Sequence, residues 1–383
     1  MDTVRLKFRY DWNSIAQEYF ELYFSEQIPQ RKLEKMTPTN SSRSVYTSNA
    51  WRKEQQKNGI YVPKYWLEAD FVDPSITYFV IELSIPKLLF GTSAREPRNE
   101  HRDLAVQKIQ EFCLAIGIRL FKQQIFGTIP SAVSFGKNID ITSLATCEQA
   151  ITVLSRFNDR FRSDIYTYRP AKGGSELYFN SKSSTFKVYD KLKEIENNAI
   201  TPEERKIVEA SKSSGQKPIW ICETLRTELT LKDTSSIKKR LKPYMKDPPT
   251  FGNIFRDDIW ADLVKNEVER VFNHPLADFV FLSTLQANVI QKLLDRHIKN
   301  PTTKLWVRDV IEKIQRFGGT KGVKRYYLEA FKSRQTYYNH LKVSKKIIKN
   351  VSLPDLENLT ASKFHSFYLG QFGIENTIQN TLF

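Results

Sequence analysis

The chain has 383 residues, 40% of them hydrophobic and 13% aromatic, which excludes a disordered chain and leaves room for two globular domains. Its 59 Lys and Arg outnumber its 43 Asp and Glu, for a formal net charge of +16. A surplus of this size attracts polyanions, so nucleic acid is the first candidate partner and an anionic membrane surface the second.

No apolar run approaches the roughly 18 residues that a membrane-spanning helix needs, so no membrane insertion is expected. The N-terminus reads as a strand and has no apolar core like that of a signal peptide. The cysteines Cys113, Cys147 and Cys222 are far apart, which favours a protein of the reducing cytoplasm without a zinc site.

The first half of the chain is predicted to be rich in strands. Alternating or apolar patterns predict strands at residues 4–12, 59–70, 76–85, 118–125, 133–141, 177–179, 185–192 and 219–231. Apolar residues at helical spacing predict helices over 101–117 and 147–161, and the polar stretch 31–56 is predicted to be a loop. This order indicates an α+β domain, a mostly antiparallel sheet with helices packed on one face.

A boundary is predicted at Asp247-Pro248-Pro249-Thr250, separating a domain of residues 1–246 from an all-helical C-terminal domain of residues 250–383. Helices are expected over 258–272, 278–298, 303–317, 321–331, 333–349 and 356–369. The tight junction near residue 333 allows a helix-turn-helix-like unit that reads base edges, and a plain helical hairpin with a polar outer face is the alternative. The candidate DNA-reading residues there are Arg334, Gln335, Tyr337 and Asn339.

Several polar residues interrupt apolar strands with the parity opposite to that of the apolar side chains. They are Glu82, Asp140, Lys187, Tyr189, Lys191, Arg226 and Glu228. If the apolar face packs on the helices, one opposite face gathers three carboxylates, a tyrosine and several cations. Each residue alone fits an ordinary solvated strand position, so only the combination of these residues on one face indicates a functional site.

Three carboxylates on one face repel one another, and a hard divalent cation with oxygen ligands relieves that repulsion. Arg226 shares the face of Glu228 and is the competing explanation, because it can neutralise the acids as a plain salt bridge. A tyrosine flanked by lysines suits attack on a phosphodiester, since cations favour phenolate and hold phosphate.

The order of these pieces resembles the replication initiators of filamentous phages and, more distantly, rolling-circle plasmid initiators and relaxases of the replication-trans type. The resemblance covers roughly residues 60–240. The pieces that carry it are Val80-Ile81-Glu82-Leu83-Ser84-Ile85-Pro86-Lys87-Leu88-Leu89-Phe90-Gly91, Leu114-Ala115-Ile116-Gly117-Ile118, Asn138-Ile139-Asp140-Ile141, Phe186-Lys187-Val188-Tyr189-Asp190-Lys191-Leu192-Lys193-Glu194 and Leu225-Arg226-Thr227-Glu228-Leu229.

The resemblance implies that Tyr189 is the nucleophile, assisted by Lys191, and that Asp140 and Glu228, with Glu82 as a weaker third, hold the metal. Lys187, Lys193 and Arg226 are candidate DNA contacts. Many rolling-circle nickases bind metal through a His-x-His pair, but the five histidines here are scattered, so carboxylates must supply the site wholly or in part. Oxygen ligands favour Mg²⁺ or Mn²⁺.

The expected function is origin-specific nicking and rejoining of one DNA strand in the cytoplasm of a bacterial host, through a 5′-phosphotyrosyl intermediate. The expected partners are a single-stranded or hairpin origin, duplex DNA, and a host helicase and polymerase, with no membrane. Two rivals stay open: a non-enzymatic DNA-binding regulator, and a metal-dependent nuclease that activates water. No Walker-type glycine loop is present, so nucleotide hydrolysis is not expected.

Overall fold

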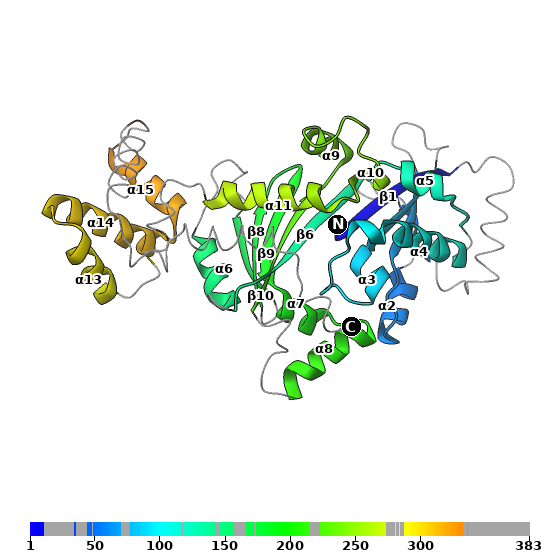
Figure 1. Ribbon diagram of the computed structural model, residues 1–383, viewed down its shortest axis with the longest axis horizontal. Helices are drawn as coiled ribbons and strands as arrows, with labels where there is room; N and C mark the ends of the chain where they lie inside the picture. The colour runs from blue at the N-terminus through cyan, green and yellow to red at the C-terminus, as the bar shows by residue number, and fades with distance from the viewer. Residues whose placement is uncertain are drawn as a thin grey trace.

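The computed structural model describes a large part of the chain (Figure 1). The described residues are 1–10, 34–35, 44–47, 49–69, 77–116, 118–142, 146–156, 166–171, 174–213, 223–272, 280, 283, 287–331 and 335. Every statement on structure below concerns these residues.

The centre of the fold is one antiparallel sheet of ten strands in the order β2-β3-β4-β5-β1-β6-β10-β9-β8-β7. The strands are β1 (Thr3–Tyr10), β2 (Glu34–Lys35), β3 (Ser44–Thr47), β4 (Lys64–Ala69), β5 (Thr77–Ser84), β6 (Ala132–Asp140), β7 (Tyr166–Ala171), β8 (Gly174–Asn180), β9 (Ser184–Asp190) and β10 (Thr224–Leu231). The predicted antiparallel sheet with helices is therefore confirmed.

The described helices are α2 (Asn49–Lys57), α3 (Ile85–Phe90), η2 (Asn99–His101), α4 (Arg102–Ala115), α5 (Lys122–Gly127), α6 (Cys147–Ser155), α7 (Lys191–Asn198), α8 (Pro202–Ser213), α9 (Thr234–Leu241), α10 (Phe251–Ile254), α11 (Asp257–Phe272), α13 (Ala287–His297), α14 (Pro301–Phe317) and α15 (Thr320–Phe331). Most of these helices lie around the sheet, whereas α13, α14 and α15 lie together to one side of it (Figure 1). Of the predicted C-terminal helices, those over 333–349 and 356–369 lie outside the described residues, apart from Gln335.

Two local predictions are wrong. The predicted strand over 118–125 gives way to α5, whose first turn is fixed when the Phe121 backbone N–H donates to Gln124 Oε1 at 2.8 Å. A capped turn outweighs the weak alternation of Ile118 and Leu120. The predicted loop over 31–56 contains β3 and most of α2, whose side chains Lys53-Glu54-Gln55-Gln56 are good helix formers without an apolar stripe.

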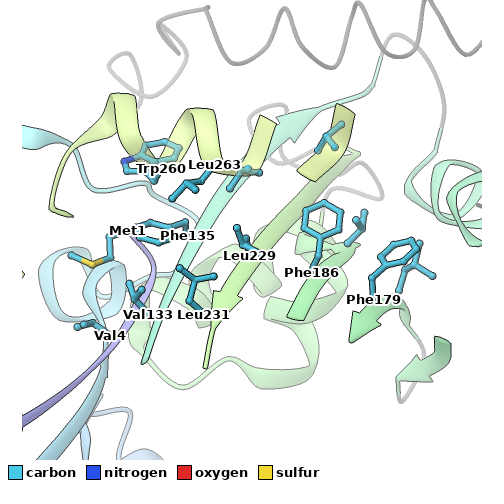
Figure 2. Close-up of a cluster of buried hydrophobic side chains, with 14 of the residues drawn as sticks. Met1, Val4, Val133, Phe135, Phe179, Phe186, Leu229, Leu231, Trp260 and Leu263 are labelled. Atoms are coloured by element: carbon cyan, nitrogen blue, oxygen red, sulfur yellow. The ribbon is translucent and has the colours of Figure 1, made fainter. Parts of the chain in front are cut away.

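One face of the sheet carries the main core. In Figure 2, Trp260 and Leu263 of α11 lie over Phe135 and Leu229 of the central strands. The helices are not confined to this face, which corrects the expectation of one-sided packing. Leu192 and Ile195 of α7 form a separate apolar cluster with Ile207 of α8, and α7 contacts β9 and β10.

The described residues after the predicted boundary at 247–250 form helices, but the first of these helices pack against the sheet domain. Beyond the boundary, α10 contacts α5, and α11 packs on β6 and β10. Burial of Trp260 and Val264 in the same core makes α11 part of the sheet domain. Within the described residues, no helix combines the length and apolarity required to cross a bilayer.

We predict that a chain ending at Lys246 does not fold cooperatively, whereas one ending at Phe272 does. Five α11 side chains are buried, and each contributes about 1.5–3 kcal/mol, which together matches the ~5–15 kcal/mol net stability of a domain. They are Ile259, Trp260, Leu263, Val264 and Val268. Thermal unfolding followed by circular dichroism checks this, and equal midpoints for the two truncations would contradict it.

Candidate active site on the polar sheet face

The predicted polar residues share one face because of the antiparallel register. Arg226 of β10 lies opposite Asn138 of β6 on one side and opposite Tyr189 of β9 on the other. Two residues along, Glu228 lies between Gly136 and Lys187 in the same way. Directly opposed residues point to the same side of a sheet, so Tyr189, Lys187 and Glu228 meet at its centre.

The contact between Tyr189 and Glu228 is the core of the site. The Tyr189 phenol donates to Glu228 Oε2 at 3.3 Å, and Lys187 Nζ donates to Glu228 Oε1 at 3.3 Å. Tyr189 is 8% exposed and Glu228 6%, whereas the Lys187 side chain is 30% exposed. The carboxylate therefore lies between a buried phenol and a cation that reaches toward solvent.

The phenol is neutral in this environment. Burial, and then the negative charge of Glu228, raise the pKa of Tyr189 well above its ordinary value, and the opposing effect of Arg226 is smaller. The expectation that neighbouring cations favour phenolate is thus wrong for the resting site. Burial alone lowers the pKa of Lys187, but Glu228 outweighs it and the pKa is raised, so Lys187 stays charged.

Lys191 approaches the ring of Tyr189 from the first turn of α7. Its Nζ lies 5.9 Å from the ring centroid and donates to Glu194 Oε2 at 2.7 Å and to Ser93 Oγ at 2.9 Å. Asp190 caps this helix by accepting from the Lys193 backbone N–H at 3.1 Å. Burial lowers the pKa of Lys191, with Arg226 adding to that effect and Glu194 opposing it. The predicted assisting lysine is thus beside the tyrosine and buried.

Ser93 and Glu194 were not predicted as site residues, and neither was Glu204. Glu204, which is fully buried, accepts from the Ser93 hydroxyl at 3.1 Å and pairs with Lys87 at 3.0 Å. Two sequence signals could have located them. Lys191 and Glu194 stand at a helical i,i+3 spacing, and Thr201-Pro202-Glu203-Glu204 has the pattern of a helix start, where the Thr201 hydroxyl accepts from the Glu204 N–H.

Arg226 was predicted to contact DNA, but the structure buries it at 1% exposure. Its guanidinium donates to Asn138 Oδ1 at 2.7 Å and pairs with Asp2 Oδ1 at 2.9 Å. It also crosses Gly136, where an added Cβ would lie 2.5 Å from Nη2. Burial acts to raise the pKa of Asp2, but the positive charge of Arg226 outweighs it, and the pKa of Asp2 is lowered. Arg226 therefore holds strands together and is not the salt-bridge partner of Glu228.

The three predicted metal ligands share the face but do not meet. Asp140 lies opposite Thr224, four residues along β6 from Gly136, the partner of Glu228. That offset corresponds to about 13 Å of strand. Asp140 accepts instead from the Thr142 hydroxyl at 2.6 Å, and Glu82, on β5, accepts from Arg5 Nε at 2.7 Å. The described residues contain no group of three His, Cys, Asp or Glu side chains suited to a metal.

The donor set therefore does not fit the predicted Mg²⁺ or Mn²⁺ site. Glu228 is the one predicted ligand beside Tyr189, and both its oxygens already accept from Tyr189, Lys187 or Thr230. Of the remaining predicted DNA contacts, Lys193 is half-buried and Gln335 is exposed. Arg334, Tyr337 and Asn339 lie outside the described residues.

Comparison of the chain with protein-family models, with curated proteins and with solved structures gave no match to any of them. The resemblance to phage and plasmid initiators stays a prediction based on sequence pieces.

We predict that Gly136→Ala destabilises the protein by ~1–3 kcal/mol, because the added methyl group collides with a guanidinium that two partners hold in place. Gly127→Ala is the matched control, since nothing lies within 4 Å of its added Cβ. Chemical denaturation of both variants measures the difference. An equal free energy of unfolding for the two would mean that Arg226 is free to move aside.

Proposed function

We propose that this protein cuts and rejoins one strand of DNA by transesterification at Tyr189, as the initiator of rolling-circle replication. The observation that carries the proposal is the Tyr189–Glu228 hydrogen bond on a face lined with lysines, in a chain of net charge +16. A tyrosine hydroxyl bonded to a carboxylate has the nucleophile and base that phosphoryl transfer requires.

Glu228 accepts the phenol proton while Tyr189 Oη forms a bond to phosphorus, and the bond from phosphorus to the 3′ oxygen breaks. The 3′ oxygen leaves with the electron pair and takes up a proton from water, which gives a 3′-hydroxyl and a 5′-phosphotyrosyl link, and Glu228 returns its proton to the solvent. Because the pKa of Tyr189 is raised by burial and by Glu228, the proton must leave as the bond forms.

The lysines have separate roles in this proposal. Lys187 pairs with Glu228 and is the more exposed of the two, so phosphate would approach on its side. Lys191, fixed by Glu194 and Ser93, stabilises the charge that develops on the transferring phosphate. Since the predicted ligands do not fit a divalent ion, none of these steps passes through a metal, and Mg²⁺ or Mn²⁺ stays a prediction.

We further propose a single-stranded or hairpin origin as substrate, duplex DNA as a second ligand, and a host helicase and polymerase as partners in a bacterial cytoplasm. A nuclease that activates water would leave no covalent adduct, and a non-enzymatic regulator would leave the DNA uncut. A denaturing gel of protein incubated with labelled origin DNA separates all three.

We predict that Tyr189→Phe lowers nicking at least ~1,000-fold and abolishes the adduct, because only the attacking oxygen is lost. DNA binding stays within about twofold, since the ring and the lysines remain. Tyr178→Phe is the control, because Tyr178 lies opposite Lys187 on the same face. Adduct formation by Tyr189→Phe, or its loss in Tyr178→Phe, would move the nucleophile to the neighbouring strand.

We predict opposite results for two acids that the sequence treats alike. Glu228→Gln removes the base and lowers nicking about 100- to 10,000-fold, whereas Asp140→Asn leaves it within about threefold, because Asp140 is exposed and about 13 Å along the sheet. Single-turnover rates in Mg²⁺ and in Mn²⁺ measure both. Equal losses that Mn²⁺ restores in both variants would support the shared metal of the sequence prediction.

A further inference from the structure

We propose that the polar face of β4, β5 and β1 is a platform on which unpaired bases of a DNA strand stack before the strand reaches Tyr189. The platform consists of Arg5, Lys7, Lys64, Trp66 and Tyr78. The sequence patterns did not predict a role for any of these residues. The proposal rests on the proposed function, because it assumes that the strand cut at Tyr189 is also the strand that binds here.

The register sets the platform residues on the face that carries Tyr189. Arg5 lies opposite Glu82, which lies opposite Lys64, and Lys7 is aligned in the same way with Val80 and Trp66. Arg5 also lies opposite Ala132 of β6, which is four residues from Gly136, the partner of Glu228. The platform thus ends about 13 Å from the active-site carboxylate along the strand direction, with β6 lying between β1 and β10.

Cations pin the two aromatic rings. Arg5 Cζ lies 5.6 Å and Lys64 Nζ 5.1 Å from the centroid of the Trp66 ring, and Lys7 Nζ lies 3.9 Å from that of Tyr78. Trp66 Nε1 also donates to Glu68 Oε2 at 3.0 Å. A ring held in this way loses little conformational freedom when a base stacks on it.

The residue types of the platform favour single-stranded over duplex DNA. All five platform residues are half-buried, so part of each side chain is within reach of a ligand. Three cations stand against two acids, Glu68 and Glu82, so a positive charge remains for phosphate. Aromatic rings interleaved with cations bind bases of any sequence by stacking, and only unpaired bases expose their faces. A duplex offers phosphates alone to this surface.

The half of the same face that carries Tyr189 is covered by a helix. Around Tyr189, α7 packs on β9 and β10, and Arg226 and Lys191 are almost completely buried. Over β4, β5 and β1, by contrast, the side chains of the two ion pairs Arg5–Glu82 and Lys7–Glu68 keep between 25% and 38% of their surface exposed. The two halves together form one track, with stacking at one end and chemistry at the other.

The test measures binding of a fluorescent oligothymidylate of about 20 nucleotides by anisotropy at one salt concentration. Trp66→Leu and Tyr78→Leu should each raise the Kd about 5- to 100-fold, while Trp66→Phe, which keeps a ring, stays within about threefold. Phe121→Leu is the matched control, because Phe121 is 54% exposed with Arg119 5.6 Å from its ring but lies off the sheet. Its Kd should not change.

Thermal midpoints identify any variant that fails to fold. Trp66→Leu and Tyr78→Leu each test the platform separately, so one can do so if the other fails to fold. Unchanged affinity in both folded leucine variants, an equal loss in Phe121→Leu, or no binding of the oligothymidylate by the wild type would overturn the platform. The outcome is separable from the proposed function. Tyr189→Phe should abolish nicking and leave the Kd for the oligothymidylate unchanged. If the platform variants bind the oligothymidylate normally, the covalent adduct at Tyr189 should still form in the wild type.

Discussion

The pairing of β10 between β6 and β9 is the constraint on which the rest of the site depends. It sets Arg226 beside Asn138 and Tyr189, and Glu228 beside Gly136 and Lys187. A slip of one residue would turn all of these side chains to the opposite face, into the apolar core. Leu225 and Leu229 occupy the other parity of β10 and are completely buried, so the core that α11 completes also fixes which residues meet Tyr189.

Burial of so many charges on that face is possible because each is paired. Arg226 pairs with Asp2, Glu228 with Lys187, and Lys191 with Glu194. Such pairs contribute little net stability, but the loss of one partner leaves an uncompensated charge in a medium of low dielectric constant. The network therefore acts mainly on geometry: it holds the Glu228 carboxylate against the Tyr189 phenol, whose pKa is raised, which is the arrangement that a proton transfer from Tyr189 needs.

Period-two alternation predicted most of the central strands and the shared face of Tyr189, Glu228, Asp140 and Glu82. It could not predict their separation, because parity says nothing about how far two residues lie apart along paired strands. Asp140 is four residues from the level of Glu228, and Glu82 lies on β5, with β1 and β6 between it and β10. Alternation also could not show which part of the face is covered, since that depends on α7 and α8, whose apolar cluster was not recognised in the sequence.

The polar face of the sheet is covered around Tyr189 and half-exposed over β4, β5 and β1. This difference would allow a DNA strand to be cut at a site that is not open to water. Around Tyr189, the low dielectric constant strengthens each hydrogen bond to the reacting groups, but it also raises the cost of bringing in a charged phosphate. Lys187 lies at the edge of the buried region with 30% of its side chain exposed, so a phosphate can meet a compensating charge as it loses water. Bases that stack on the half-exposed strands beyond would hold the strand while that exchange takes place, which joins recognition and chemistry on a single sheet surface.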